Sequence, residues 1–220
     1  MRYALCDMRG MIFKNREEAG VQLLAQLLNF QNQKDVVVVA LPRGGVVLGS
    51  VIAKGLKASL DIVVPRKIGH PDNSEYAIGA LAEGGEIVWN QTERRLLTLE
   101  RLDPIIEVEK KEHARLLEKY RACLPERDFR NKTIIIVDDG IATGLTMIAG
   151  INSVKIFGPK QIVVAVPIAS ADTVEKVRAH VDEMAVYLIP EFLGAIGEFY
   201  QDFTQVKDEE MIRFLTSPCL

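Results

Sequence analysis

Cysteine and histidine are both scarce in this sequence, with three of each among 220 residues. The cysteines are widely spaced, odd in number and form no CxxC pair, which argues against a disulfide framework and favours a reducing compartment. The histidines share no spacing typical of metal ligands, so a zinc site is not expected either.

Long apolar runs and an excess of one charge are also missing. No apolar run approaches the ~18 residues that span a bilayer, and the first ten residues, MRYALCDMRG, lack the apolar core of a secretory signal. The 27 basic and 30 acidic residues leave a net charge of −3, which does not favour nucleic acid or an anionic membrane as a partner. We therefore expect a cytoplasmic protein with no membrane and no nucleic-acid partner.

The overall composition is that of a globular protein. Hydrophobic residues make up 48% of the chain, enough for the core of a single domain over residues 1–220, and no repeat or low-complexity linker divides it. Unbroken apolar runs predict buried strands at 35–41, 59–65, 133–138, 161–168 and 185–190. Helical stretches are expected at 15–30, 46–57, 92–123, 144–157 and 172–183. This alternation predicts an α/β fold with an open, mostly parallel twisted sheet flanked by helices.

The helical segments carry three finer signals. In segment 15–30, the apolar residues that share one face at helical spacing are Val21, Leu24, Leu27 and Leu28. Asp172 is followed three residues later by Glu175, a capping-box pattern. Pro104 is expected to interrupt the charged stretch from 92 to 123.

The segment from 68 to 90 is dense in glycine, proline, asparagine and serine. A long segment of this kind in a compact α/β domain is usually either a functional loop or a hairpin. Both alternatives remain open at the level of sequence.

Two adjacent acids end one of the apolar runs, in the stretch TIIIVDDGIATGLTM (133–147). Unpaired charge is costly to bury, so Asp138 and Asp139 are expected at the strand end, where their oxygens suit hydroxyl groups or a hydrated metal ion. The glycines and threonines that follow predict a turn into a helix N-terminus, whose free amides suit a phosphate. A sugar phosphate satisfies both halves of this motif.

Basic residues follow two other expected strands. The run at 35–41 leads into Arg43-Gly44-Gly45, and the run at 59–65 leads into Arg66-Lys67. Because ligands gather at the carboxyl ends of the strands in such sheets, these groups are expected to face a second polyanion such as pyrophosphate. The stretch GGVVLGSV lacks the lysine of a Walker motif and the spacing of GxGxxG, and the chain contains no GxSxG elbow.

In their order along the chain, these motifs resemble the type I phosphoribosyltransferases, enzymes that use 5-phosphoribosyl-1-pyrophosphate (PRPP). The stretch IIIVDDGIATGLTM matches the family's core pattern at nearly every position, ALPRGGVVLG resembles its pyrophosphate loop, and PRKIG resembles the basic end of its next strand. The resemblance covers roughly residues 15–205.

The resemblance implies that pyrophosphate at C1 of PRPP is displaced by a base nitrogen, through an oxocarbenium-like transition state. Asp138 and Asp139 would hold the ribose hydroxyls and lend negative potential near the cation. The residues implied for the 5-phosphate are Gly140, Ile141, Ala142, Thr143, Gly144, Leu145 and Thr146. Those implied for pyrophosphate are Arg43, Gly44, Gly45, Arg66 and Lys67. Mg²⁺ would be carried by PRPP near the two acids, with little direct protein ligation.

Two further regions are implied by the resemblance. Segment 68–90 would be a flexible loop that excludes water, with Glu75 and Tyr76 as its notable side chains, although a solvated loop carboxylate is the alternative for Glu75. The N-terminal part and residues 187–215 would form a hood over the nucleobase. Phe192 would stack on the base or, equally, lie in the core.

The acceptor implied by the resemblance is a nucleobase, with a purine favoured and its identity open, as in nucleotide salvage. Ala142 stands where 6-oxopurine enzymes typically carry an aspartate, which argues against a hypoxanthine-type mechanism. A homo-oligomer is also implied.

A regulator that binds PRPP without catalysis is the alternative function, and a binder of another sugar phosphate is a third one. The retention of Arg43, Arg66 and Lys67 favours catalysis.

Overall fold

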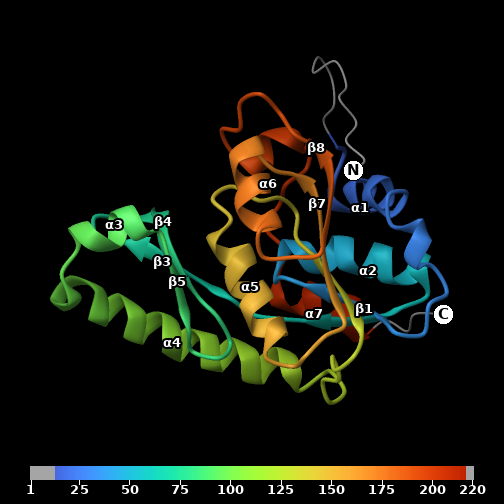
Figure 1. The fold of residues 1–220 in the computed structure, drawn as a ribbon, viewed down its shortest axis with the longest axis horizontal. Helices are drawn as coiled ribbons and strands as arrows, with labels where there is room; N and C mark the ends of the chain where they lie inside the picture. Colours follow the sequence, from blue (N-terminus) through green and yellow to red (C-terminus); the bar gives the residue numbers. More distant parts are fainter. Residues whose placement is uncertain (1–12, 217–220) are drawn as a thin grey trace.

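The computed structural model describes residues 13–216, which form a central sheet between two layers of helices with an arm beside them (Figure 1). The strands of the central sheet are β1 (Val36–Ala40), β2 (Ser59–Ile62), β6 (Thr133–Val137), β7 (Gln161–Ile168) and β8 (Glu183–Leu188). The helices around it are α1 (Arg16–Leu24), α2 (Gly44–Leu56), α5 (Leu145–Lys155), α6 (Ala171–Arg178) and α7 (Asp208–Thr216), with short 3-10 turns at Leu28–Phe30 and Ile196–Phe199.

All neighbouring strands of the central sheet are parallel, in the order β2-β1-β6-β7-β8. In the register of the middle pair, Val38 lies opposite Ile135. The predicted α/β class with an open parallel sheet is confirmed. Because every strand runs the same way, the carboxyl ends of β1, β2 and β6 lie at one edge of the sheet.

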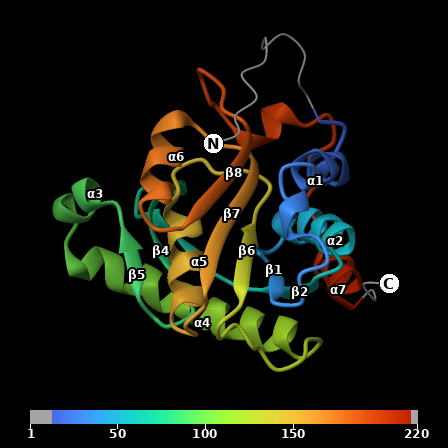
Figure 2. The same cartoon turned by 45° about the vertical axis from the view of Figure 1, so that its right-hand side comes forward.

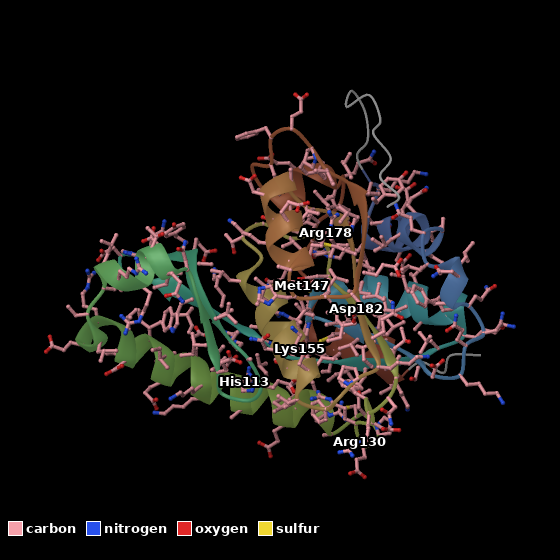
Figure 3. The ribbon with its side chains drawn as sticks, in the orientation of Figure 1. His113, Arg130, Met147, Lys155, Arg178 and Asp182 are labelled. Carbon is pink, nitrogen blue, oxygen red and sulfur yellow. The ribbon has the colours of Figure 1, made fainter. Side chains whose placement is uncertain are left out.

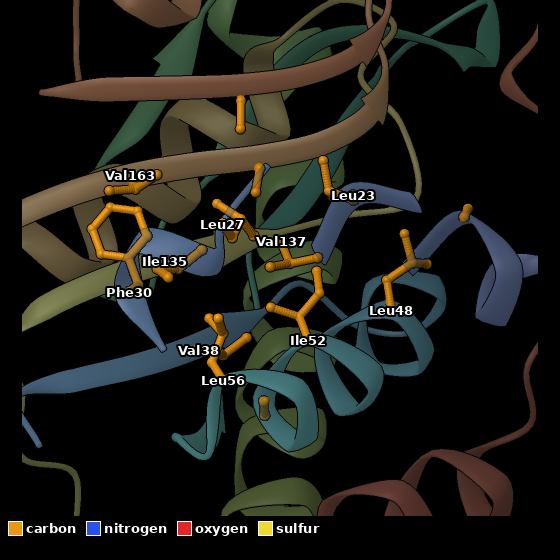
Figure 4. Packing of buried hydrophobic residues seen from close by; sticks show 14 of the residues in the cluster. Leu23, Leu27, Phe30, Val38, Leu48, Ile52, Leu56, Ile135, Val137 and Val163 are labelled. Carbon is orange, nitrogen blue, oxygen red and sulfur yellow. The ribbon is translucent and has the colours of Figure 1, made fainter. Parts of the chain in front are cut away.

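Alternate residues of the strands enter two separate cores. Val38, Ile135 and Val163 pack against α1 and α2 on one face (Figure 4), whereas Val39 and Ile136 pack against α5 and α6 on the other. Figure 2 shows the two helical layers on opposite sides of the sheet. Burial on both faces explains why these strands are unbroken apolar runs.

The arm, residues 66–110, extends to one side of the central sheet (Figure 1). It consists of an antiparallel sheet of β3 (Arg66–His70), β4 (Asn73–Leu81) and β5 (Ile87–Trp89), followed by α3 (Gln91–Leu96) and the first half of α4 (Leu99–Arg121). Its own small core contains Ile68, Ile78, Leu81, Leu97 and Leu102. Segment 68–90 is therefore a hairpin with a third strand rather than an irregular loop, and its flexibility stays a prediction.

Helix α4 joins the arm to the central domain. The helical stretch is interrupted at Leu97–Thr98, between α3 and α4, so the expectation that Pro104 interrupts it was wrong. Pro104 is the sixth residue of α4, where the proline ring removes one backbone hydrogen bond close to the helix start, and the helix continues. Further along, His113 Nδ1 donates to the Val64 carbonyl over 2.8 Å, and Figure 3 shows His113 in the middle of α4.

Two other helix predictions need correction. Helix α1 buries Ala19, Gly20 and Leu23, so its buried face is rotated from the predicted one: Leu24 is half-buried and Val21 is 56% exposed. The helix ends at Leu24, and Leu28 lies in a 3-10 turn that changes the phase. Leu27 is buried as expected, and Leu28 is exposed.

Helix α6 starts one residue before the predicted cap. Its N-cap is Ser170, whose Oγ accepts from the Thr173 amide, and not Asp172. Within residues 13–216, no helix is long and apolar enough to cross a membrane.

Candidate active site

The segment 42–45, which joins β1 to the first turn of α2, is called the glycine loop. It contacts the acid pair, Asp138 and Asp139, that follows β6. A Cβ added to Gly44 would lie 1.9 Å from Asp139 Oδ2, and one added to Gly45 would lie 2.7 Å from the Val137 carbonyl oxygen. Both distances are too short for a side chain, so the two glycines are what allows the loop to approach the acids. The loop also contains a cis peptide bond between Pro42 and Arg43.

The two carboxyl groups differ in their partners. Asp138 Oδ1 accepts from the Asp139 amide over 2.8 Å, and Asp139 Oδ2 accepts from Arg16 Nε, also over 2.8 Å. Burial raises the pKa of both carboxyls. The charge of Asp139 raises the pKa of Asp138 further, whereas the Arg16 guanidinium offsets part of the shift at Asp139. A hydroxyl donor or a cation would stabilise this pair in its ionised form.

The acid pair could contribute two carboxylate groups to a hydrated metal ion. Among the described residues there is no group of three or more histidine, cysteine or acidic side chains that could hold a metal ion. The donor set thus fits a cation shared with a polyanionic ligand better than a cation bound by protein alone.

The turn from Gly140 to Thr146 leads into the N-terminus of α5. Gly144 has φ +84°, a conformation that favours glycine, and it directly precedes the first residue of the helix. Within residues 13–216, the amides of Thr143, Gly144 and Leu145 make no backbone hydrogen bond, so they remain available for an anion at the positive end of the helix dipole.

Neighbouring elements fix the shape of this turn. The Ile141 amide donates to the Ile168 carbonyl over 2.8 Å, and Thr173 Oγ1 donates to the Ala142 carbonyl over 2.7 Å. The side chains of Ala142 and Thr143 are exposed. The hydrogen bond from α6 therefore fixes the turn at Ala142, directly before the three amides available for an anion.

The basic residues predicted for pyrophosphate are only partly brought together. Arg43 and Arg66 line one small cavity, whereas Lys67 forms a 3.3 Å ion pair with Glu75 inside the arm. Arg43 precedes Gly44 and therefore lies one residue from the contact with Asp139. Arg66 is paired with Glu109 of α4 at 2.7 Å.

The remaining predicted residues lie on the arm and at the other end of the site. Tyr76 Oη donates to Glu93 Oε1 over 3.0 Å, and Tyr76 lines a cavity of about 780 Å³ that also reaches Ala142 and Thr143. Phe192 is 82% exposed, so the core alternative for this side chain was wrong, and its contact with a base stays a prediction.

Arg16 and Tyr200, which the sequence did not single out, contact Asp139, and Phe203 packs against Arg16. Arg16 donates Nη1 to the Thr204 carbonyl over 2.9 Å, and its guanidinium carbon lies 3.9 Å from the centroid of the Phe203 ring. Tyr200 Oη donates to the Asp139 carbonyl over 2.7 Å. The aromatic-rich stretch GEFYQDF (197–203) was a usable signal for Tyr200 and Phe203, whereas nothing in the sequence marked Arg16.

The residues predicted to form the hood lie in different regions of the structure. Residues 1–12 lie outside the described residues, and Phe13 is bonded to the 199–201 segment through two backbone hydrogen bonds. Within 187–215, the segment 196–204 approaches the acids, whereas α7 packs against α2 and the end of α4. A covering role for the first of these parts stays a prediction.

Comparison with known proteins adds a family assignment to this geometry. Residues 9–198 match the family model of a phosphoribosyl transferase domain. A Mycobacterium tuberculosis protein named "Putative phosphoribosyl transferase Rv0571c" is 37% identical over 206 residues, which are 93% of this chain and 46% of that protein. The chain thus spans about half the length of the curated relatives it matches.

Solved structures agree with the fold. The crystal structure of TT1426 from Thermus thermophilus has a TM-score of 0.77 and 36% sequence identity, covering 94% of this chain and 98% of that chain. AQ2163 from Aquifex aeolicus, with 12% identity and a TM-score of 0.50, covers 91% of this chain and 84% of that chain, which is a likeness of fold alone.

Proposed function

The chain belongs to the phosphoribosyl transferase family, and from this premise we propose that it transfers the 5-phosphoribosyl group of PRPP to a nucleobase with release of pyrophosphate. One observation carries the proposal. The acid pair, the glycine loop and the amide turn meet at one edge of the parallel sheet, with Gly44 in contact with Asp139. A sugar bearing a phosphate at one end and a pyrophosphate at the other matches this arrangement.

The ribose is placed on the acid pair. Asp138 and Asp139 accept hydrogen bonds from the 2- and 3-hydroxyls, and their negative charge stabilises the positive charge that develops on the ring in the transition state. Arg16 keeps the Asp139 carboxylate oriented through the 2.8 Å contact and favours its ionised form. Mg²⁺ carried with PRPP near these acids would neutralise charge on the pyrophosphate.

The two ends of the substrate are held by backbone amides and by guanidinium groups. Residues Gly140 to Thr146 bind the 5-phosphate, mainly through the amides ahead of α5, and so fix the ring in place. Arg43, Gly44, Gly45 and Arg66 bind the leaving pyrophosphate. Lys67 joins them if its ion pair with Glu75 opens.

The arm supplies the exclusion of water that the reaction requires, because water would otherwise hydrolyse PRPP. Tyr76 and the turn residues Ala142 and Thr143 border the same cavity, so movement of the arm toward the sheet would cover the phosphate turn. Glu75 acts in this scheme only through its ion pair with Lys67.

The acceptor is a nucleobase, with a purine favoured, as in cytoplasmic nucleotide salvage by a homo-oligomer. Ala142 offers no acid to the ring, which disfavours a hypoxanthine-type mechanism. Phe192, with 82% of its surface exposed, is available to stack on the base.

The test is a base panel. The protein is incubated with PRPP, magnesium and each nucleobase in turn, and release of pyrophosphate is measured. Asp138→Asn combined with Asp139→Asn should remove turnover while circular dichroism reports an intact fold. Full activity of that double variant would contradict the sugar-binding role. PRPP binding without turnover on any base would support a PRPP-binding regulator instead, and absence of PRPP binding would exclude both functions.

A further inference from the structure

A second charged site lies beside the acid pair, at the carboxyl ends of β1 and β2. It is a small cavity of about 130 Å³. Three arginines line it from three different elements: Arg43 before α2, Arg66 on β3 and Arg115 on α4. Two acids, Glu112 of α4 and Asp208 of α7, border the same space.

Each of these arginines faces a carboxylate. Arg66 contacts Glu109 at 2.7 Å, and Arg115 makes two 2.8 Å hydrogen bonds to Glu112. Arg43 is held more loosely, because its Nη1 is 3.6 Å from Asp208 Oδ1, beyond hydrogen-bond distance. The side chains of Arg43 and Arg115 are 40% and 56% exposed, so both can turn toward an anion in the cavity.

Asp208 is fixed more firmly than the arginine it faces. Its carboxylate accepts from Lys119 Nζ over 2.6 Å and from Tyr120 Oη over 2.8 Å. The hydrogen bond from Lys119 lowers the pKa of Asp208, which therefore carries its charge at neutral pH. An anion that approaches Arg43 meets this anchored negative charge.

We propose that the cavity is part of the pyrophosphate site, that Arg115 is an additional ligand of pyrophosphate, and that Asp208 competes with pyrophosphate for Arg43. The inference rests on the proposed function, in which pyrophosphate is the leaving group. Guanidinium groups bind phosphate oxygens in bidentate fashion, and three of them around one small cavity suit a group with several negative oxygens. Arg115 then favours the binding of pyrophosphate, and Asp208 opposes it.

The experiment is calorimetric titration of inorganic pyrophosphate, with magnesium, into the full chain. Arg115→Gln should weaken binding about tenfold, as expected for the loss of hydrogen bonds to a charged group. Asp208→Asn keeps an acceptor for Tyr120 and should strengthen binding about two- to fivefold, in line with the small energy of a partly exposed ion pair.

Each variant has a matched control of the same charge change. Arg101→Gln alters another exposed arginine of α4, and Glu209→Gln alters the exposed acid next to Asp208. Both controls should bind pyrophosphate as the unmodified protein does. Loss of packing would weaken binding in every case, so tighter binding by Asp208→Asn distinguishes competition from a structural effect.

The outcomes separate this inference from the proposed function. Pyrophosphate binding that is unchanged in Arg115→Gln and Asp208→Asn, relative to the controls, overturns the inference and leaves the function standing. No pyrophosphate binding by the unmodified protein overturns both. Binding by Asp208→Asn that is no tighter than that of Glu209→Gln overturns the competition by Asp208, and unchanged binding by Arg115→Gln overturns the ligand role of Arg115.

Discussion

Asp138→Asn should make the protein more stable at neutral pH. The carboxyl group is largely enclosed, stands next to Asp139, and has one hydrogen bond from the Asp139 amide over 2.8 Å. Burial first, and then the charge of Asp139, raise its pKa well above the ordinary value of 3.8. An asparagine keeps the oxygen that accepts the amide hydrogen bond and removes the charge.

The expected gain is about 1–2 kcal/mol, within the range for a buried polar group that lacks full compensation. For a chain of this size, that raises the melting temperature by about 3–6 °C. The sign follows from proton binding. Because the folded-state pKa is raised, the unfolded chain loses its proton first, and stability falls as pH rises from about 4 through the folded-state pKa. The difference between variant and unmodified protein should therefore be small near pH 4 and larger at pH 8.

The assay is thermal unfolding followed by circular dichroism at both pH values. Asp103→Asn, a change at an exposed acid of α4, serves as the control and should shift neither midpoint. A lower midpoint for Asp138→Asn at pH 8, or the same difference at pH 4 and pH 8, would refute the electrostatic reasoning.

Two further substitutions test the contacts around Asp139. Gly44→Ala places a Cβ 1.9 Å from Asp139 Oδ2 and should lower kcat/KM for PRPP by about 10²-fold, whereas Gly84→Ala, with open space around its Cβ, should leave it unchanged. Arg16→Gln removes the interaction that lowers the pKa of Asp139, so the acid limb of the pH–rate profile should move to higher pH; a limb that stays in place would show that Arg16 does not tune this carboxyl.

The central sheet could be predicted because each of its strands can be recognised from residues that are adjacent in the sequence. Each strand is an unbroken apolar run, and the residues after β1 and β6 differ sharply from the runs that precede them. The same local contrast identified Gly44 and Asp139, whose neighbours in sequence already suggest a ligand site. Their contact in the structure follows from the parallel pairing of two adjacent strands.

Other features depend on contacts between distant parts of the chain. Arg16 and Asp139 are 123 residues apart, and an arginine near the start of a helix is ordinary in any sequence. The arm was ambiguous because its sequence is polar at the tip, where Asn73, Ser74 and Glu75 are exposed. The phase of α1 was mispredicted at Leu28, since periodicity does not reveal where a 3-10 turn replaces the helix.

Helix α4 gives the molecule a mechanical property. Its 23 residues make a rod about 35 Å long, with Leu102 packed in the arm and Tyr120 bonded to Asp208 at the other end. If the rod pivots about His113, which is hydrogen-bonded to the Val64 carbonyl, a tilt of about 10° displaces its N-terminal end by about 4 Å. A displacement of Tyr120 at its contact with Asp208 would then be about doubled at the start of α4, which makes α4 a lever between α7 and the arm.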